Sequence, residues 1–187
     1  MRFYNAMPDK NIFVDKIFKW IVDIVVVVVL AIFFITYFCS QTKVVGNSMS
    51  NTLVNGDNVM INTLSYKMGS PERFDVVVIE KKGKNGDTSE YIKRIIGLPG
   101  ETVQIINGRI YINDELLDYN EDSDNIVNAG LAAEKIKLDY NEYFVMGDNW
   151  NNSEDSRSST LSNVKLDEIK GKIWLISWPF VRINVVK

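Results

Sequence analysis

The chain has 187 residues with a net charge of −3, one Cys and no His. The lack of His excludes a Ser-His-Asp triad, a Cys-His dyad and a His-ligated zinc site, and the single Cys excludes an intrachain disulfide and a thiolate metal cluster. The mildly acidic balance argues against broad nucleic-acid binding, which needs a basic surface. Acid–base chemistry in this chain would therefore have to use Lys, Asp, Glu or Tyr.

The first forty residues contain one long apolar run. Residues 24–39 (IVVVVVLAIFFITYFC) carry no charge, and within residues 20–39 only Asp23 interrupts the apolar pattern. About twenty helical residues cross a hydrocarbon core of about 30 Å. The run is too long for the core of a cleaved signal peptide, and no A-x-A pattern follows it. We therefore expect a retained transmembrane helix over residues 20–39, with a buried core segment as the alternative.

Basic residues gather on one side of this run. Those that precede it are Arg2, Lys10, Lys16 and Lys19. Lys43 is the only Lys or Arg for more than twenty residues after it. The positive-inside rule then predicts a cytoplasmic segment at residues 1–19 and an extracytoplasmic domain at residues 40–187 on the plasma membrane. Asp23 fits the inner interface, one helical turn from Lys19, and an intramembrane functional acid is the alternative.

From about residue 43 onward, strand and turn signals dominate the sequence. Alternating apolar positions and β-branched runs predict strands, and helical patterning is weak. Asn107-Gly108 between two alternating runs predicts a type I′ hairpin. We therefore expect a mostly-β domain of partly closed sheets. The expected strands are residues 58–63, 75–80, 90–96, 102–106, 109–113, 140–146, 172–178 and 181–186, and the short helical pieces are near 47–54, 130–136 and 164–169.

Lys93 is a candidate base. Alternation in the segment YIKRII puts Tyr91, Lys93 and Ile95 on one face of a strand, with Arg94 on the other. A lysine can act as a base only when its pKa falls well below its usual value of about 10.4, and burial among apolar groups has this effect. Alternation alone fits equally a strand whose lysine face is solvated.

Ser48 is a candidate nucleophile. It follows Gly46 in a run of small polar residues, and such a run forms a tight turn that exposes a hydroxyl and directs backbone N–H groups. The alternative is a helix N-cap, since Ser, Asn and Thr all cap well.

A third polar cluster spans residues 147–157, in which only Trp150 is apolar. It would either orient a base, held by an Asp155–Arg157 ion pair, or form a solvated loop with Asx turns.

Taken together and in order, these segments resemble the bacterial type I signal peptidases, the membrane-bound Ser-Lys endopeptidases, in their Gram-positive form. The resemblance covers about residues 40–187, and the expected anchor fits it. The matching segments are residues 48–53 (SMSNTL, similar to S-M-x-P-T-L), 56–59 (GDNV, similar to G-D-x-V), 73–78 (RFDVVV, similar to R-G-D-V-V-V), 91–101 (YIKRIIGLPGE, similar to the lysine motif) and 147–157 (GDNWNNSEDSR, similar to G-D-N-R-x-x-S-x-D-S-R).

The resemblance implies a role for each matching residue. Ser48 would be the nucleophile and Lys93 the general base. The Ser48 N–H would serve the oxyanion hole, and Ser153 would orient Lys93. The residues expected to form the oxyanion hole or support the dyad are Gly46, Met49, Ser153, Asp155, Arg157 and Asp148.

The implied activity is removal of N-terminal signal peptides from exported preproteins through an acyl-enzyme, with cleavage after small residues in Ala-x-Ala-like sites. The implied partners are signal peptides and the lipid bilayer, without nucleic acid, cofactor or metal. An extended substrate would add to a sheet edge near Ser48. Repressor autoproteases of the SOS response share the dyad, but they lack an anchor and carry a DNA-binding part.

Three positions depart from the resembled motifs: Asn51 stands in place of Pro, Phe74 in place of Gly, and Trp150 in place of Arg. The loss of Pro removes a restraint next to Ser48. It motivates the alternative of a non-catalytic or narrowly specialised membrane-anchored family member that binds or processes dedicated substrates.

Overall fold

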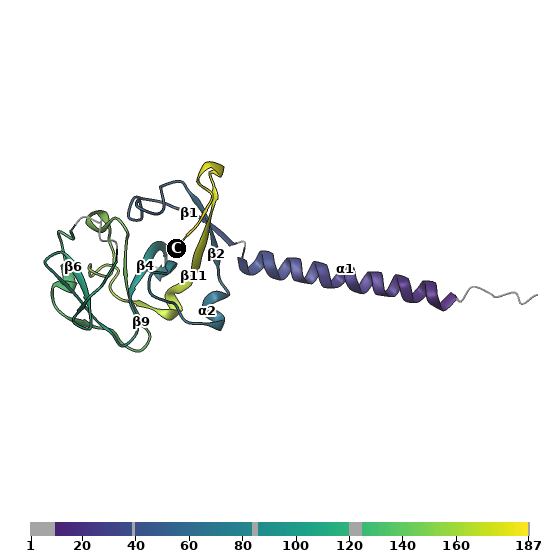
Figure 1. Ribbon diagram of the computed structural model, residues 1–187, viewed down its shortest axis with the longest axis horizontal. Helices are drawn as coiled ribbons and strands as arrows, with labels where there is room; N and C mark the ends of the chain where they lie inside the picture. The colour runs from purple at the N-terminus through teal and green to yellow at the C-terminus, as the bar shows by residue number, and fades with distance from the viewer. Residues whose placement is uncertain (1–9, 39, 84–85, 120–124, 187) are drawn as a thin grey trace, which may run out of the picture.

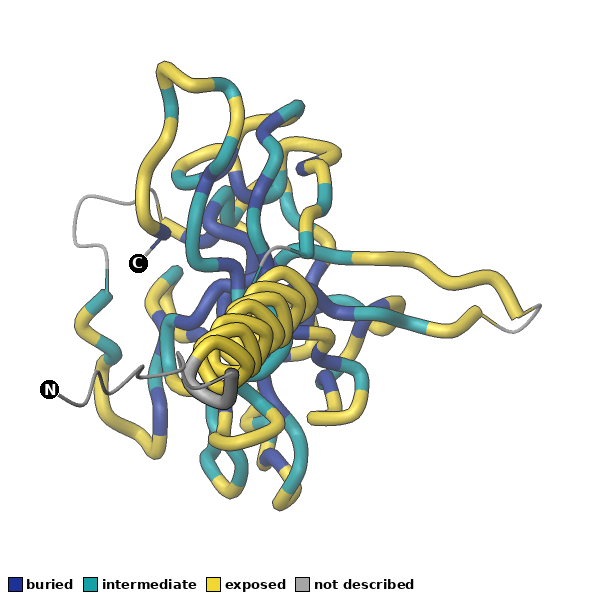
Figure 2. The backbone as a smooth tube through the Cα atoms, turned by 90° about the vertical axis from the view of Figure 1, so that its right-hand side faces the viewer, coloured by how far each residue is buried: buried dark blue, intermediate teal, exposed yellow. Residues whose placement is uncertain are grey.

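One long helix projects from a β-rich body in the computed structural model, which describes residues 10–38, 40–83, 86–119 and 125–186 (Figure 1). The helix α1 (Lys10–Phe38) has 29 residues. Its segment from Phe13 to Phe38 has a mean hydropathy of 2.9 and buries none of its apolar window, so it is long and apolar enough to cross a membrane. Figure 2 shows this helix nearly end-on and exposed along its length.

The helix α1 begins ten residues before the expected start at residue 20, because no Gly or Pro separates residues 10–19 from the apolar run. Its end is attached to the body. The Thr63 N–H donates to the Tyr37 carbonyl at 3.1 Å, and Trp174 Nε1 donates to the Phe38 carbonyl at 3.3 Å. These bonds satisfy two of the carbonyls that a helix leaves unpaired at its C-terminus. Cys39, the last residue of the expected span, lies outside the described residues.

The larger sheet has eight antiparallel strands. Its order is β1-β2-β11-β3-β4-β9-β10, with β12 paired to β11. Expected strands account for β2, β3, β4, β9 and β11, whereas β1 lies ahead of the region where strand signals were found. The bounds are β1 (Ser40–Lys43), β2 (Asn58–Asn62), β3 (Val76–Lys82), β4 (Thr88–Gly97), β9 (Glu142–Met146), β10 (Val164–Lys165), β11 (Ile169–Trp178) and β12 (Asn184–Val185).

The smaller sheet has the order β7-β6-β5-β8. Its central hairpin joins β5 and β6 through Asn107 and Gly108, whose φ values of 51° and 75° are both positive, as a type I′ turn requires. The hairpin prediction is confirmed. The bounds are β5 (Thr102–Ile106), β6 (Arg109–Ile112), β7 (Glu115–Leu116) and β8 (Ile136–Lys137).

The mostly-β prediction is confirmed, and the larger sheet curls strongly. Within the described residues it is an open path from β1 to β10. Its curvature nevertheless brings β1 to β4, although three strands lie between them in the order, so that Thr42 Oγ1 donates to Glu90 Oε2 at 3.2 Å. Buried residues concentrate inside the body (Figure 2). The core under the β1 side is made by Val44, Met49, Leu53, Val59, Ile61, Val76, Val78, Ile173, Ile176 and Val186.

One element prediction is wrong and another is right only in part. No helix covers residues 47–54, which form consecutive turns. Within the expected strand at residues 181–186, residues 184–185 form β12, which pairs with β11, whereas residues 181–182 belong to the 3₁₀ helix η4 (Phe180–Arg182). Two features account for η4. Pro179 has no N–H for a sheet ladder, and Arg182 forms an ion pair with the buried Asp57 at 3.1 Å.

The remaining helices are short connections. The helix α2 (Ser65–Met68) was not expected. The expected piece near 130–136 is η1 (Gly130–Ala133), and the piece near 164–169 is split between β10 and η3 (Leu166–Glu168). The helix η2 (Trp150–Asn152) lies in the polar cluster at residues 147–157.

Candidate active site

Lys93 is buried in the middle of β4, with 3% of its surface exposed. The strand β4 runs between β3 and β9, and Lys93 lies opposite Val77 in the β3 register. Burial lowers the pKa of Lys93, while the carboxylates of Asp155 and Glu154 act in the opposite direction. The alternative of a solvated lysine face is therefore wrong, because both faces of this part of β4 are buried.

Ser48 and Lys93 line one cavity of about 250 Å³. The cavity lies where the curled sheet brings the segment after β1 against β4, and its lining consists of residues 42–46, 48–49 and 90–93. Gly46 has a φ of +91°, a left-handed conformation that favours glycine, and it turns the chain toward Ser48. The N-cap alternative for Ser48 is wrong, since turns follow it.

Of the two backbone polar groups of Ser48, the described structure shows a hydrogen bond for the carbonyl only. Its carbonyl accepts the Asn149 N–H at 2.9 Å. Across the described parts of the chain, no acceptor is bonded to the Ser48 N–H. The Gly46 N–H, in contrast, donates to Asn55 Oδ1 at 3.2 Å. Of these two amides, the one at Ser48 is available for an oxyanion.

Ser153 contacts the lysine directly, since its Oγ and Lys93 Nζ are hydrogen-bonded at 3.2 Å. Gly147 makes this arrangement possible. A Cβ atom at Gly147 would lie 2.3 Å from Ser153 Oγ and 2.4 Å from the Ser48 carbonyl oxygen. Gly147 therefore belongs to the site because any side chain at this position would displace Ser153 or Ser48. The sequence analysis did not identify this role.

The Asp155–Arg157 ion pair is present and almost fully buried. Arg157 Nε donates to one carboxylate oxygen and Nη2 to the other, both at 2.8 Å. Asp155 Oδ2 also accepts the Gly147 N–H at 3.1 Å, and Arg157 Nη2 donates to the Trp150 carbonyl at 2.6 Å. The pair fixes the loop that carries Ser153.

A second buried ion pair joins Asp148 to Arg94, and the sequence analysis missed it. Arg94 Nε and Nη2 donate to its two carboxylate oxygens at 2.8 and 2.7 Å. The Asp148 N–H donates to Met49 Sδ at 3.4 Å, and Thr52 Oγ1 donates to Asp148 Oδ2. The available signal was an arginine directly before the apolar pair Ile95-Ile96 in a strand, because a buried guanidinium needs a carboxylate partner.

The three departures from the resembled motifs each have a structural role. Asn51 Nδ2 donates to the Asp148 carbonyl at 3.1 Å and so bridges the Ser48 loop to the loop after β9. Phe74 adopts a φ of +73° and stacks on Tyr119 at 4.5 Å between ring centroids. The Trp150 side chain packs against the apolar cluster that contains Val103 and Ile110. Metal sites are a separate matter: the residues that the structure describes contain no group of three His, Cys, Asp or Glu side chains arranged to hold an ion.

Comparison with known proteins identifies the family. The family described as signal peptidase, peptidase S26, matches residues 17–178. Signal peptidase I S of Bacillus subtilis (strain 168) is 35% identical over 192 residues, which cover 93% of this chain and 96% of that protein. Signal peptidase I P of Bacillus subtilis subsp. natto is 32% identical over 190 residues, 97% of this chain and 100% of that protein.

A further relative and a solved structure carry the same name. Signal peptidase IB of Staphylococcus aureus (strain COL) is 33% identical over 182 residues, 88% of this chain and 91% of that protein. A crystal structure of a signal peptidase I from Enterococcus faecalis V583 is 29% identical and covers 55% of this chain and 95% of that one, at a TM-score of 0.42. The chain therefore belongs to the signal peptidases of peptidase family S26, the serine endopeptidases that remove signal peptides from preproteins.

Proposed function

We propose that this signal peptidase is a membrane-anchored enzyme that cuts exported preproteins with a Ser48–Lys93 dyad. The observation that carries the proposal is the shared cavity, in which Lys93 is buried and bonded to Ser153 while Ser48 lines the same wall. Burial supplies what a lysine base requires, a pKa below its ordinary value.

The acylation step follows from this arrangement. Neutral Lys93 Nζ takes the proton of Ser48 Oγ while Oγ attacks the carbonyl carbon of the residue before the cleavage site. The developing oxyanion is stabilised by the Ser48 N–H, an interaction of the kind worth a few kcal/mol in acyl transfer. When the peptide C–N bond breaks, the Lys93 ammonium returns the proton to the leaving amine.

The deacylation step uses the same groups. A water molecule attacks the Ser48 ester, Lys93 takes a proton from that water, and the proton passes to Ser48 Oγ as the ester bond breaks. Ser153 holds Lys93 Nζ in line throughout. Gly46 and Met49 shape the Ser48 turn. Asp148, Asp155 and Arg157 support the two loops from behind.

The small cavity suits short side chains. An extended peptide would lie along residues 44–46, add to the exposed edge that continues β1, and direct small side chains into the 250 Å³ space. Cleavage after Ala-x-Ala-like sites is the specificity that such a space supports.

The helix α1 would be the membrane anchor. With Lys16 and Lys19 on the cytoplasmic side, residues 40–187 form an extracytoplasmic catalytic domain. Substrate and enzyme would then share one bilayer, which raises their effective concentration.

The test is cleavage of a preprotein by the full-length chain in detergent, with mass spectrometry locating the cut. Ser48→Ala and Lys93→Ala should each lower kcat by at least about 10³-fold, since both groups act in the chemical step. Ser89→Ala, at an exposed serine on β4, is the matched control and should cleave as the wild type does. Substantial turnover by a folded Ser48→Ala or Lys93→Ala variant would refute the dyad. A folded wild type that cuts no preprotein would favour a family member that only binds substrates.

A further inference from the structure

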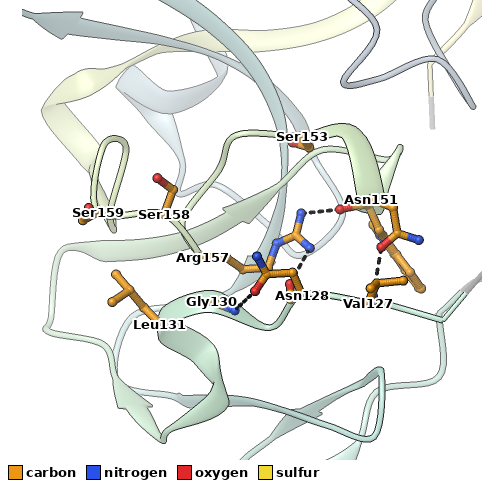
Figure 3. A pocket seen from close by; sticks show the side chains of 10 residues that line it. Val127, Asn128, Gly130, Leu131, Asn151, Ser153, Arg157, Ser158 and Ser159 are labelled. Atoms are coloured by element: carbon orange, nitrogen blue, oxygen red, sulfur yellow. Dashed lines mark hydrogen bonds between the residues drawn. The ribbon is translucent and has the colours of Figure 1, made fainter.

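A second cavity, of about 650 Å³, opens beside the loop that carries Ser153. Two segments contribute to its lining, the first through residues 127–128 and 130–131 and the second through residues 150–151, 153 and 157–159. Figure 3 shows Ser158 and Ser159 on one side of it and Asn151 and Val127 on the opposite side. Its volume lies in the range of about 300–1,000 Å³ that is common for ligand-binding clefts.

The walls of the second cavity are held by hydrogen bonds, so its shape exists before any ligand binds. Asn151 Oδ1 accepts the Val127 N–H at 2.9 Å, and Asn151 Nδ2 donates to the Asn125 carbonyl at 3.1 Å. On the other segment, the Leu131 N–H donates to the Arg157 carbonyl at 2.8 Å. A preformed wall lowers the ordering cost of binding.

One hydrogen bond links the lining of the second cavity to the lining of the Ser48 cavity. Ser153 lines the second cavity, and Lys93, to which Ser153 is hydrogen-bonded, lines the first. A substrate cut at Ser48 has its acyl half in the first cavity. Its amine half must leave past Lys93, which protonates that amine. Ser153 thus places the second cavity next to the group that would protonate this half of the substrate.

The lining is close to neutral. Its one charged side chain, Arg157, is paired with Asp155, and the other members are hydroxyl, amide and apolar groups. Such a surface does not fit a phosphate or a nucleotide, which need uncompensated positive charge. It fits an extended peptide of varied sequence, whose backbone meets the polar groups and whose side chains meet Val127, Leu131 and Trp150.

We propose that the second cavity binds the first residues of the mature protein, those that follow the cleavage site. The proposal rests on the proposed function, because it takes Ser48 and Lys93 as the place of cleavage. It makes the enzyme responsive to the mature sequence as well as to the signal peptide.

A kinetic experiment on the full-length chain in detergent tests the binding. Two peptide substrates share the same signal-peptide residues. One continues for five residues after the cut and the other ends in a small amide leaving group. In Leu131→Trp, the ratio of kcat/KM for the long over the short substrate should fall about tenfold, because the new ring fills the cavity. In Leu116→Trp the ratio should stay at the wild-type value, since Leu116 on β7 is equally exposed (51% against 50% for Leu131) but lies outside the cavity lining. An unchanged ratio in Leu131→Trp would overturn the proposal.

A crosslinking experiment separates this proposal from the proposed function, because it needs no turnover. The long substrate carries a photoreactive side chain either three residues before or two residues after the cut, and it is bound to full-length Ser48→Ala. Crosslinks of the downstream probe within residues 127–131 or 158–159 support the proposal, and crosslinks only elsewhere overturn it. If the upstream probe fails to label residues 42–46 or 90–93, the proposed function fails instead.

Discussion

Lys93 combines two properties that rarely occur together, a central strand position and an amine. The strand β4 buries Lys93 and its neighbours Arg94 and Ile95 alike, so the ammonium form loses most of its hydration. Arg94 keeps its charge because Asp148 binds it through both oxygens. Among the residues that the structure describes, Lys93 Nζ is hydrogen-bonded only to the Ser153 hydroxyl, which suits a neutral amine. Two adjacent buried basic groups thus have pKa values shifted in opposite directions: burial lowers the pKa of Lys93, whereas at Arg94 the effect of burial is outweighed by the hydrogen bonds to Asp148, which raise its pKa.

The pH dependence of cleavage should follow Lys93. The proposed mechanism requires the neutral amine, so kcat/KM should rise with pH, with its midpoint below about 10.4. The exposed Glu154 carboxylate raises the pKa of Lys93 against the effect of burial. Glu154→Gln should therefore lower the pKa of Lys93 and move the rising limb of the profile to lower pH. A pH–rate profile measures the shift, and Glu134→Gln, at another exposed glutamate, should leave the profile in place. A shift to higher pH in Glu154→Gln would contradict this account.

Gly147 should tolerate no side chain. In Gly147→Ala the new methyl group would press on Ser153 Oγ and on the Ser48 carbonyl, which lie 2.3 and 2.4 Å from its position. We expect kcat to fall about 100-fold, as a displacement of about 1 Å in a catalytic group can cause. Gly69→Ala is the control, because its nearest contact would be at 3.3 Å. Wild-type kcat in Gly147→Ala would show that Ser153 and Ser48 do not need their present spacing.

At the scale of elements, the site is a junction of two loops. Residues 47–52 carry the proposed nucleophile Ser48, and residues 147–157 carry Ser153, which is hydrogen-bonded to the proposed base. Side chains from both loops bridge the gap. Asn149 Nδ2 donates to the Asn47 carbonyl and to Ser50 Oγ, and Asn51 Nδ2 donates back to the Asp148 carbonyl. A cross-loop hydrogen bond thus stands where the resembled motif has the local restraint of a proline.

The bond from Asn51 should matter for turnover more than for binding. Asn51→Ala should lower kcat about tenfold with little change in KM, because Ser48 is held less firmly. Asn51→Asp, with nearly the same shape, should lose at least as much, since a carboxylate cannot donate to the Asp148 carbonyl. Steady-state kinetics measure both variants. Because Asn149 spans the same loops, Asn51→Ala and Asn149→Ala should be non-additive in kcat. Additive effects, or wild-type kcat in Asn51→Ala, would refute a shared bridge.

The strands and the site motifs could be predicted from the sequence because both depend on residues that are close together in the chain. The alternation around Lys93 predicted β4, and Asn107-Gly108 predicted the hairpin turn. What escaped prediction depends on contacts across the chain. Gly147 matters because of atoms in Ser48 and Ser153, and Arg94 because of a carboxylate 54 residues away. Residues 181–186 look like a strand, but the ion pair of Arg182 with Asp57 favours a turn of 3₁₀ helix there.

At the scale of the whole molecule, the attachment of α1 to the body should affect only substrates in a membrane. Trp174→Phe keeps the ring but removes the donor to the Phe38 carbonyl. We expect cleavage of a preprotein in vesicles to fall about threefold, the effect of one net hydrogen bond. Cleavage of a soluble peptide in detergent should stay at the wild-type rate. Trp178→Phe, at a more exposed tryptophan on β11, is the control for both assays. Equal losses in the two assays would mean that Trp174 supports the body and not its attachment.

If α1 is the anchor proposed above, the short path from α1 to Ser48 sets the height of Ser48 above the bilayer. Ser48 follows the last helical residue, Phe38, by only ten positions, and the bonds to Thr63 and Trp174 hold the helix end against the body. At about 3.3 Å per residue, the nucleophile can stand no more than about 33 Å from the end of the helix. A substrate anchored in the same leaflet would have to present its cleavage site within this distance. The fold would then act as a ruler, one that selects how far from its own apolar segment a preprotein presents the bond to be cut.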